Sequence, residues 1–446
     1  MTRHYGSDEL MAYLEGNDAI IDPAKAAAHL SECPRCTDRL ANVRLDYLLL
    51  SDPDVWEGAG EKPEAHAPPP ARLAEYVTIR QQMADEAARA EVVFDDLSKR
   101  PLDSWVEHLT LAPGDCTDGM VARLIAGARE AKAQQPKRAL DMLAVAEAAA
   151  MLAFADPDKA EVFGDLWKER ANVHTIRGDY LSAHAAIDRA EMVYEQVAIP
   201  GYKLAFTTWA RANLYLQMER YADALPLAER SAATFAQFGD ELHENQVRVL
   251  VAGVLYEQGD LTSAERNFLS LLEPLEHAGD RITQAAVLTN LACCRLFQED
   301  LPAAEAYAQR AIALYSEFQM EAEIMHVRYA FGLVYLRRGE SDRGIRALTT
   351  VAAEFWDKGL PIYGASVELH IVAEYIQRGE YPLAADVAAR LHATFAAAGT
   401  RISAAKALAF LHEAALAAAA TPELVRAVRH VVTHPEQPFV APPLPA

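Results

Sequence analysis

The chain has 446 residues, a net charge of −22 and a hydrophobic fraction of 51%. So large an apolar fraction excludes wholesale disorder, and an acidic chain without a basic cluster is unsuited to bind nucleic acid directly. No apolar run approaches the ~18 residues of a membrane span, and the first residues lack the apolar core of a secretory signal. Five cysteines are too few for a disulfide scaffold. We therefore predict a soluble, cytoplasmic protein.

The first 52 residues form a separate module of three short helices in this prediction. Ser7 is placed to cap the first helix, and Gly16 ends it. Asp22 and Pro23 suit the start of the second helix. The third begins near Cys33 and continues through a leucine-rich segment. Since a core this small is only marginally stable, the module needs another source of stability.

A metal ion is the stabilising group that the sequence indicates. His29, Cys33 and Cys36 have the spacing H-x3-C-x2-C, which lets two thiolates and one imidazole face the same tetrahedral zinc ion. A closed site needs a fourth ligand, for which His4 is the best candidate and Asp8 a poorer one. The alternative is that both cysteines are buried thiols and the histidine a helix cap.

This arrangement resembles the zinc-binding anti-sigma factor domain. The resemblance rests on a helix that reads Glu-Leu-Met-Ala-Tyr-Leu-Glu-Gly, followed by His29-Leu30-x2-Cys33-x2-Cys36 and preceded by His4. The resemblance implies that His29, Cys33, Cys36 and His4 bind zinc, and that the module sequesters a bacterial sigma factor. Oxidation of zinc-bound thiolates is a further candidate for the input signal.

The third helix carries more leucines than one small module buries. Leu45, Leu48 and Leu49 lie beyond its core positions. They are candidates for docking a partner helix, and packing against the rest of the chain is an equally good interpretation.

Residues 53–71, which follow the module, are rich in proline and alanine. We predict that they form a linker, because this composition cannot build a core. Residues 72–120 are predicted to be a helical connector without an assigned role. At the other end, residues 433–446 are rich in proline and are predicted to be a disordered tail.

Residues 121–432 are dominated by an internal repeat with a period of about 40 residues. A short polar turn recurs at positions 178, 219, 259, 299, 339 and 379, and a second series recurs midway, at 239, 279, 319, 359 and 399. The intervening segments have the composition and apolar spacing of helices, so each period contains one antiparallel helical hairpin. Together with the helices of the N-terminal module, this pattern predicts an all-α fold. Small residues occupy fixed places where the two helices would cross: Ala183, Ala224, Ala264, Ala304, Gly344 and Ala384, with Ala171, Ala212, Ala252, Ala292 and Gly332.

This pattern resembles the tetratricopeptide repeat (TPR), in its alternation of small and large residues and its Gly-Asp/Glu-aromatic turns. The units here are about 40 residues long, against the usual 34. The resemblance implies an α-solenoid with a concave groove for a protein or peptide. Lys168, Asn172, Trp209 and Asn213 are candidates to line this groove; the alternative is that they are solvated or packing residues.

Two interpretations of function remain open. One is a regulator that sequesters a sigma factor through the zinc module and receives another protein in the groove. The other is a TPR adaptor or scaffold whose zinc module is purely structural. Nucleotide-binding loops and hydrolase motifs do not occur, and Cys293 and Cys294 are interpreted as core residues of a repeat helix. We expect no enzymatic activity.

The zinc hypothesis predicts about one zinc ion per chain in purified protein. His29→Ala and Cys33→Ser should each lose the metal, as measured by atomic emission, because three donors hold zinc much more weakly than four. Cys116→Ser is the matched control, since this cysteine belongs to no ligand pattern, and it should retain zinc. A wild-type protein purified without metal would contradict the hypothesis.

Overall fold

The computed structural model describes residues 25–26, 29–30, 70–156, 161–197 and 200–419. All regular secondary structure in these ranges is helical, which confirms the predicted all-α class for this part of the chain. None of the helices in these ranges is long and apolar enough to cross a membrane. Of the predicted module, only residues 25–26 and 29–30 are described, both helical, and the second pair includes His29. The predicted ligands His4, Cys33 and Cys36, the leucines Leu45, Leu48 and Leu49, and the tail 433–446 lie outside the described residues.

The chain divides into two compact units. The smaller comprises Met1–Leu124 and Ala146–Pro157, and the larger comprises Ile125–Val145 and Asp158–Ala446. Two helices, α6 (Asp118–Ala131) and α7 (Pro136–Ala153), contribute residues to both units.

The smaller unit accounts for most of the segment 72–120. It contains α4 (Pro70–Ser98), η2 (Leu102–Ser104), α5 (Trp105–Leu111) and η3 (Pro113–Asp115). Trp105 is fully buried and contacts Phe94 edge-on, with 5.7 Å between the ring centroids. The guanidinium of Arg123 stacks 3.7 Å from the Phe94 ring centroid and forms an ion pair with Glu91. This segment therefore has an aromatic core of its own.

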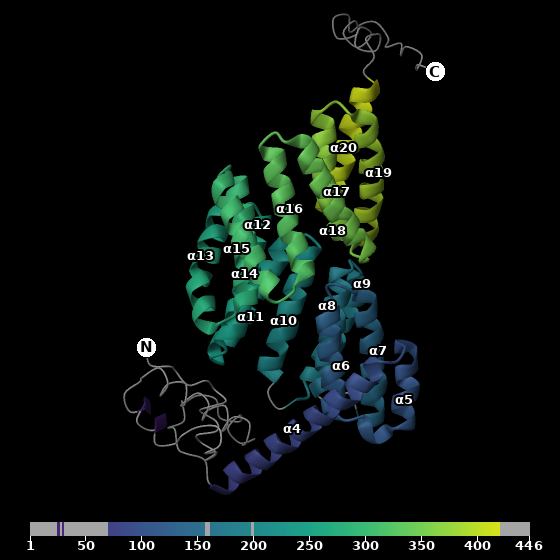
Figure 1. Ribbon diagram of the computed structural model, residues 1–446, viewed down its shortest axis with the longest axis vertical. Helices are drawn as coiled ribbons and strands as arrows, with labels where there is room; N and C mark the ends of the chain where they lie inside the picture. The colour runs from purple at the N-terminus through teal and green to yellow at the C-terminus, as the bar shows by residue number, and fades with distance from the viewer. Residues whose placement is uncertain (1–24, 27–28, 31–69, 157–160, 198–199, 420–446) are drawn as a thin grey trace, which may run out of the picture. The chain divides into compact units, whose positions relative to one another are not determined.

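The larger unit is a series of helical hairpins, visible as paired ribbons in Figure 1. Its helices are α8 (Glu161–Ile176), α9 (Tyr180–Tyr194), α10 (Pro200–Gln217), α11 (Tyr221–Gln237), α12 (Glu241–Glu257), α13 (Leu261–Ala278), α14 (Arg281–Phe297), α15 (Leu301–Glu317), α16 (Glu321–Arg337), α17 (Ser341–Asp357), α18 (Pro361–Gln377), α19 (Tyr381–Ala398) and α20 (Arg401–Ala419). Each packs on the next in sequence. The predicted antiparallel hairpins with turns about every 20 residues are confirmed here.

The recurring turns stop each helix and start the next. Glycines at the predicted turn positions adopt positive φ, for example Gly259 at +87°, a conformation that ends a helix at little cost only for glycine. The aspartate after the glycine begins the following helix: the carboxylate of Asp260 accepts a hydrogen bond from the amide of Ser263. Asp179, Asp240, Asp280 and Asp300 cap their helices in the same way.

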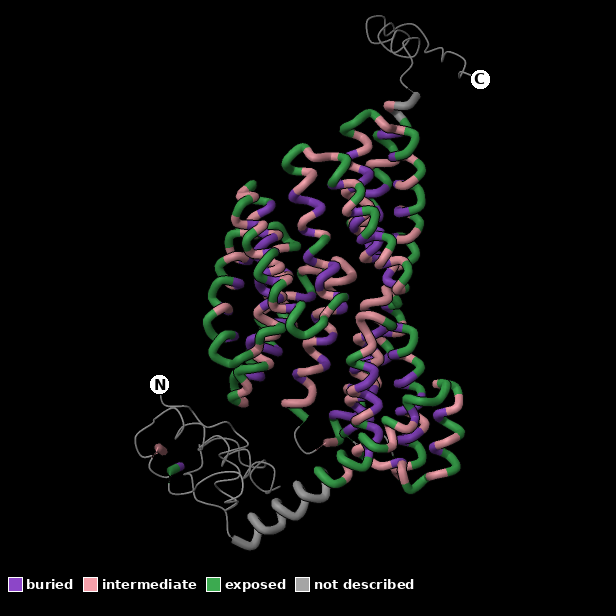
Figure 2. Tube along the Cα trace, viewed as in Figure 1, coloured by how far each residue is buried: buried purple, intermediate pink, exposed green. Residues whose placement is uncertain are grey.

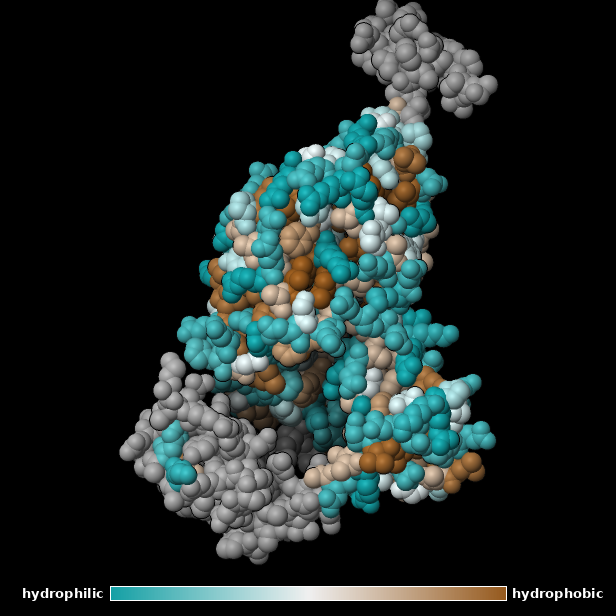
Figure 3. Space-filling model, in the orientation of Figure 1, coloured by the Kyte–Doolittle hydropathy of each residue, from teal (hydrophilic) through white to brown (hydrophobic). Residues whose placement is uncertain are grey.

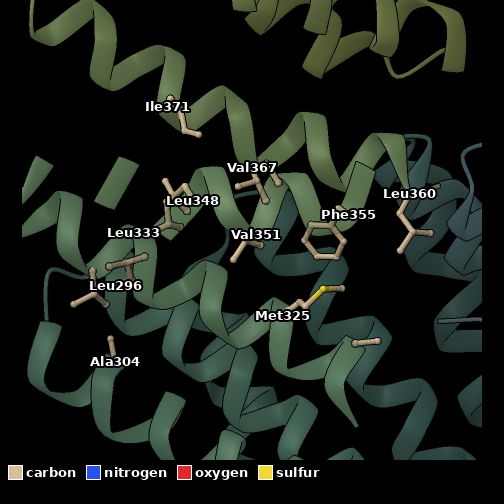
Figure 4. Close-up of a cluster of buried hydrophobic side chains, with 13 residues drawn as sticks. Leu296, Ala304, Met325, Leu333, Leu348, Val351, Phe355, Leu360, Val367 and Ile371 are labelled. Carbon is tan, nitrogen blue, oxygen red and sulfur yellow. The ribbon is translucent and has the colours of Figure 1, made fainter. Parts of the chain in front are cut away.

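The predicted small residues lie at the helix crossings, as expected. Ala183, Ala212, Ala252, Ala264 and Ala384 are fully buried, and Figure 2 shows buried residues recurring along the helices of the hairpins. Larger side chains fill the space between crossings. In Figure 4, Phe355 of α17 lies near both Met325 of α16 and Val367 of α18, and all three belong to one cluster of buried side chains. The core is therefore a continuous seam between successive helices.

Candidate functional site

The first helices of successive hairpins form one continuous surface, which we call the inner face. Helices α8, α10, α12, α14, α16, α18 and α20 each contact the next first helix in this series. The second helices of successive hairpins are farther apart. In a curved stack, the closer elements lie on the inside of the bend, so the inner face is concave.

One pocket on the inner face contains all four groove residues predicted from the sequence. Its volume is about 660 Å³, and it is lined by Lys168 and Asn172 of α8 and by Trp209 and Asn213 of α10. We call it the basic pocket, because three cations, Arg129, Lys132 and Lys168, line it together with two carboxylates, Asp165 and Glu169. The structure thus places the four predicted residues together, and their binding role stays a prediction.

Glu169, which also lines the basic pocket, organises the charges of its neighbours. Its side chain is 2% exposed; one carboxylate oxygen lies 2.8 Å from Lys132 Nζ and the other 3.4 Å from Arg129 Nε. Burial alone would raise the pKa of Glu169, but Lys132, Lys168 and Arg129 outweigh it and lower the pKa to about 2. The amide of Asn172 also donates to this carboxylate, at 3.3 Å. One buried anion therefore holds several polar side chains of the pocket in place.

Lys168 has a different environment from the other cations. Its ammonium lies 5.0 Å from the ring centroid of Phe206 and 3.8 Å from an Asp165 oxygen. Burial lowers the pKa of Lys168, although Asp165 and Glu169 oppose this effect. A partly desolvated ammonium next to an aromatic ring is well suited to bind an anionic group that replaces its lost hydration.

A second pocket, of about 520 Å³, lies farther along the inner face. We call it the tyrosine pocket; its lining includes Tyr221, Tyr256, Tyr315, Tyr329 and Tyr363, together with Glu219, Glu257, Glu323, Asn290, Cys293 and His326.

Two carboxylates of the tyrosine pocket, those of Glu257 and Glu323, form no salt bridge within the described residues. Burial raises the pKa of both, although the charges of Lys406 and Lys132, respectively, oppose this effect. Burial also lowers the pKa of His326 to about 4, so this imidazole is neutral near pH 7. The pocket therefore offers carboxylates and aromatic rings, a combination that favours a cationic group.

The sequence analysis missed the tyrosine pocket, although the repeat contains the signal that locates it. Trp209 and Asn213 occupy fixed places relative to the turn at 219, and the same places relative to the turn at 299 are Thr289 and Cys293. Both of these residues line the tyrosine pocket. Extending the two predicted positions by the repeat period would have found them.

The interpretation of the two adjacent cysteines needs a correction. Cys294 is fully buried in the core, as predicted, whereas Cys293 lines the tyrosine pocket. Burial raises the pKa of both thiols to about 12, so neither is an activated nucleophile. Among the described residues, no group of three or more histidine, cysteine or acidic side chains could hold a metal ion.

The surface around the pockets is mixed in character. On the face shown in Figure 3, hydrophobic residues form separate patches among hydrophilic ones. Exposed charged side chains are paired between repeats, for example Arg378 at the end of α18 with Asp342 of α17, at 2.6 Å. Such exposed pairs contribute little stability individually.

Comparison with known proteins agrees with the repeat architecture. Residues 243–317, which span α12 to α15, match the tetratricopeptide repeat family. The chain therefore contains TPR-type helical repeats.

The solved structures that are similar to the chain include the following three. A Rap protein complexed with competence and sporulation factor is 15% identical, over 75% of this chain and 98% of the other, with a TM-score of 0.49. Aspartyl phosphate phosphatase F from Bacillus subtilis is 10% identical, over 94% and 96%, with a TM-score of 0.42. A signal transduction ATPase with numerous domains and a TPR sensor, from Pyrococcus horikoshii, is 13% identical, over 97% and 75%, with a TM-score of 0.44. No curated protein matches the sequence.

The environment of Glu169 predicts a pH-dependent contribution to stability. Because its folded-state pKa lies below the ordinary value of 4.5, the ionised side chain stabilises the fold above that pH, and this stability is lost as the pH falls toward 2. At pH 7, Glu169→Gln should lower the free energy of unfolding by about 1–3 kcal/mol. In urea titrations the difference from wild type should shrink as the pH falls from about 5 to about 3.

Glu161→Gln is the control for the Glu169 prediction. Glu161 forms an ion pair with Lys203, but its side chain is 52% exposed. Its loss should cost no more than about 1 kcal/mol. An effect of Glu169→Gln that is the same at every pH would contradict the assigned charge network.

Proposed function

We propose that the protein is a regulator that acts by binding other proteins rather than by catalysis. In this proposal its inner face binds a polypeptide segment, and its N-terminal module binds zinc and sequesters a sigma factor. The observation that carries the first part is the pair of pockets of opposite character on one concave face. The second part is supported by the sequence motif of His29, Cys33 and Cys36.

The dimensions of the pockets suit side chains of a polypeptide. Volumes of about 660 and 520 Å³ fall in the range of sites that enclose small groups. Both pockets lie on the same series of first helices, so one extended segment could reach both. The amides of Asn172, Asn213 and Asn290 are suited to hydrogen-bond a peptide backbone, because each amide group offers both a donor and an acceptor.

The charges give the proposed segment a direction. Lys168 favours an anionic group in the basic pocket, such as an acidic side chain or a terminal carboxylate. Glu257 and Glu323 favour a basic side chain in the tyrosine pocket. A segment with these groups in the opposite order would place like charges together, which is unfavourable.

The sigma-factor part of the proposal draws on the chemistry of the N-terminal donors. Two thiolates and one imidazole at this spacing are ligands that zinc prefers, and zinc would supply the stability that a module of about 50 residues lacks. A net charge of −22 is complementary to a basic partner surface. Leu45, Leu48 and Leu49 are the proposed contacts, and a sigma partner would place the protein in the bacterial cytoplasm.

The adaptor is the alternative function. In this case the zinc module is only structural, and the inner face alone selects partners. The two proposals differ in whether the zinc ligands are needed for partner recovery.

The groove proposal is tested with peptides selected from a random display library against the full chain. Asn213→Ala and Lys168→Ala should each weaken binding of the selected peptides by about tenfold in fluorescence anisotropy, since central polar contacts dominate such interfaces. Glu276→Ala, on the exposed side of α13, is the control and should bind as wild type does. Equal affinities of all three variants would place the peptides elsewhere.

The sigma-factor proposal is tested by affinity purification from the native cell. Wild-type protein should recover a sigma factor, identified by mass spectrometry, and Cys33→Ser should lose it because the module requires zinc. Asn213→Ala should still recover it, since the groove is a separate site. Recovery of unrelated proteins equally by wild type and Cys33→Ser would favour the adaptor.

A further inference from the structure

The last helix of the repeat array, α20, takes its N-terminal cap from a residue in a distant repeat. First helices earlier in the array begin at Asp240 and Asp280, whose carboxylates accept hydrogen bonds from their own first turns. The corresponding residue before α20 is Thr400, and its hydroxyl donates back to the carbonyl of Phe395 at 3.1 Å. The first turn of α20 therefore needs an acceptor from elsewhere.

Glu219, in the turn between α10 and α11, supplies that acceptor. Its carboxylate accepts from the backbone amide of Ile402 at 2.6 Å and from that of Ser403 at 2.9 Å, and the Ser403 hydroxyl donates to it as well. A carboxylate at a helix N-terminus is favoured both by hydrogen bonding and by the helix dipole. These bonds join residues 183 and 184 positions apart in the sequence.

Glu219 holds this cap from a backbone conformation that is unusual for a residue with a side chain. Its φ is +60°, at a turn position where other repeats have glycine. A side chain in this conformation is strained. Glu299 has the same backbone, with φ of +62°, yet its side chain makes no hydrogen bond or ion pair within the described residues. Both glutamates therefore have the same strained backbone, but only the side chain of Glu219 forms hydrogen bonds.

Other contacts at the same place bring early and late turns together. Gly178, in the turn between α8 and α9, lies so close to Ile362 of α18 that a Cβ would be 2.7 Å from its Cγ1. Lys358, just before α18, donates to the side chain of Gln134. Ala398 of α19 packs on the cluster that contains Tyr180. The larger unit thus closes on itself, and we call this set of contacts the closure.

The closure also forms a wall of the tyrosine pocket. From the early side, Leu216, Gln217 and Glu219 line the pocket. From the late side, Ile362, Thr400 and Ser403 line it. Separation of the two sides would remove one wall, so the pocket is complete only in the closed state.

We propose that Glu219 is a positioning residue that holds the repeat array closed and thereby completes the tyrosine pocket. Given the proposed binding function, a segment that contacts both sides would stabilise closure, because ligands shift an equilibrium toward the state that they bind better. The closure itself requires no ligand, so it can be tested on the full chain alone.

The test compares Glu219→Gly with Glu299→Gly by hydrogen–deuterium exchange and mass spectrometry. Both changes relieve the same strain, but only the first removes the cap. In Glu219→Gly, peptides that cover residues 400–406 and 360–366 should exchange about tenfold faster than in wild type. In Glu299→Gly, the same peptides should exchange as in wild type, and the melting temperature should rise. Glu219→Gln keeps one carboxamide oxygen as an acceptor. It should therefore also speed exchange in both segments, but by less than Glu219→Gly does.

Two results would overturn the proposal. If both segments exchange as in wild type in Glu219→Gly and Glu219→Gln, the carboxylate does not hold the closure. If only residues 400–406 respond, Glu219 is a local helix cap and does not join the two sides. A failure of the peptide test with a positive exchange result would reject the binding function and leave the closure intact.

Discussion

The close approach of helices at small residues is the constraint on which the larger unit depends. Ala252 on α12 and Ala264 on α13 are both fully buried, and equivalent small residues recur in the neighbouring hairpins. A larger side chain at these points would push the helices apart, because protein interiors have no spare volume. Regular crossings let every hairpin stack on the next in the same way. The resulting curvature gathers polar side chains from successive first helices onto one face.

Much of the repeat architecture could be predicted from the sequence, because each feature has a local physical cause. Turn glycines such as Gly259 must adopt positive φ, and the following Asp260 must cap a helix, so both leave a regular pattern in the chain. That Lys168, Asn172, Trp209 and Asn213 lie together was predictable for the same reason, since they occupy equivalent positions in adjacent repeats. The N-terminal module remains a sequence-based prediction, as most of it lies outside the described residues.

The features that could not be predicted depend on contacts between distant repeats. Glu169 looks like an ordinary helix carboxylate in the sequence, yet Lys132 and Arg129 surround it once α6 and α8 pack together. Glu219 looks like an irregular replacement of glycine, and its role emerges only where α20 returns to the early hairpins. The residues near one another in the sequence predict helix ends, turns and burial well. They do not predict which distant repeats will come into contact.

The closure has a consequence for how such an array could vary over evolutionary time. Open solenoids tolerate the gain or loss of a unit, because each unit contacts only its neighbours. Here the turn that contains Glu219 must meet the start of α20. Duplication or deletion of one hairpin between these points would carry α20 past its partner or stop short of it. A fold assembled from interchangeable units has thereby acquired a fixed length.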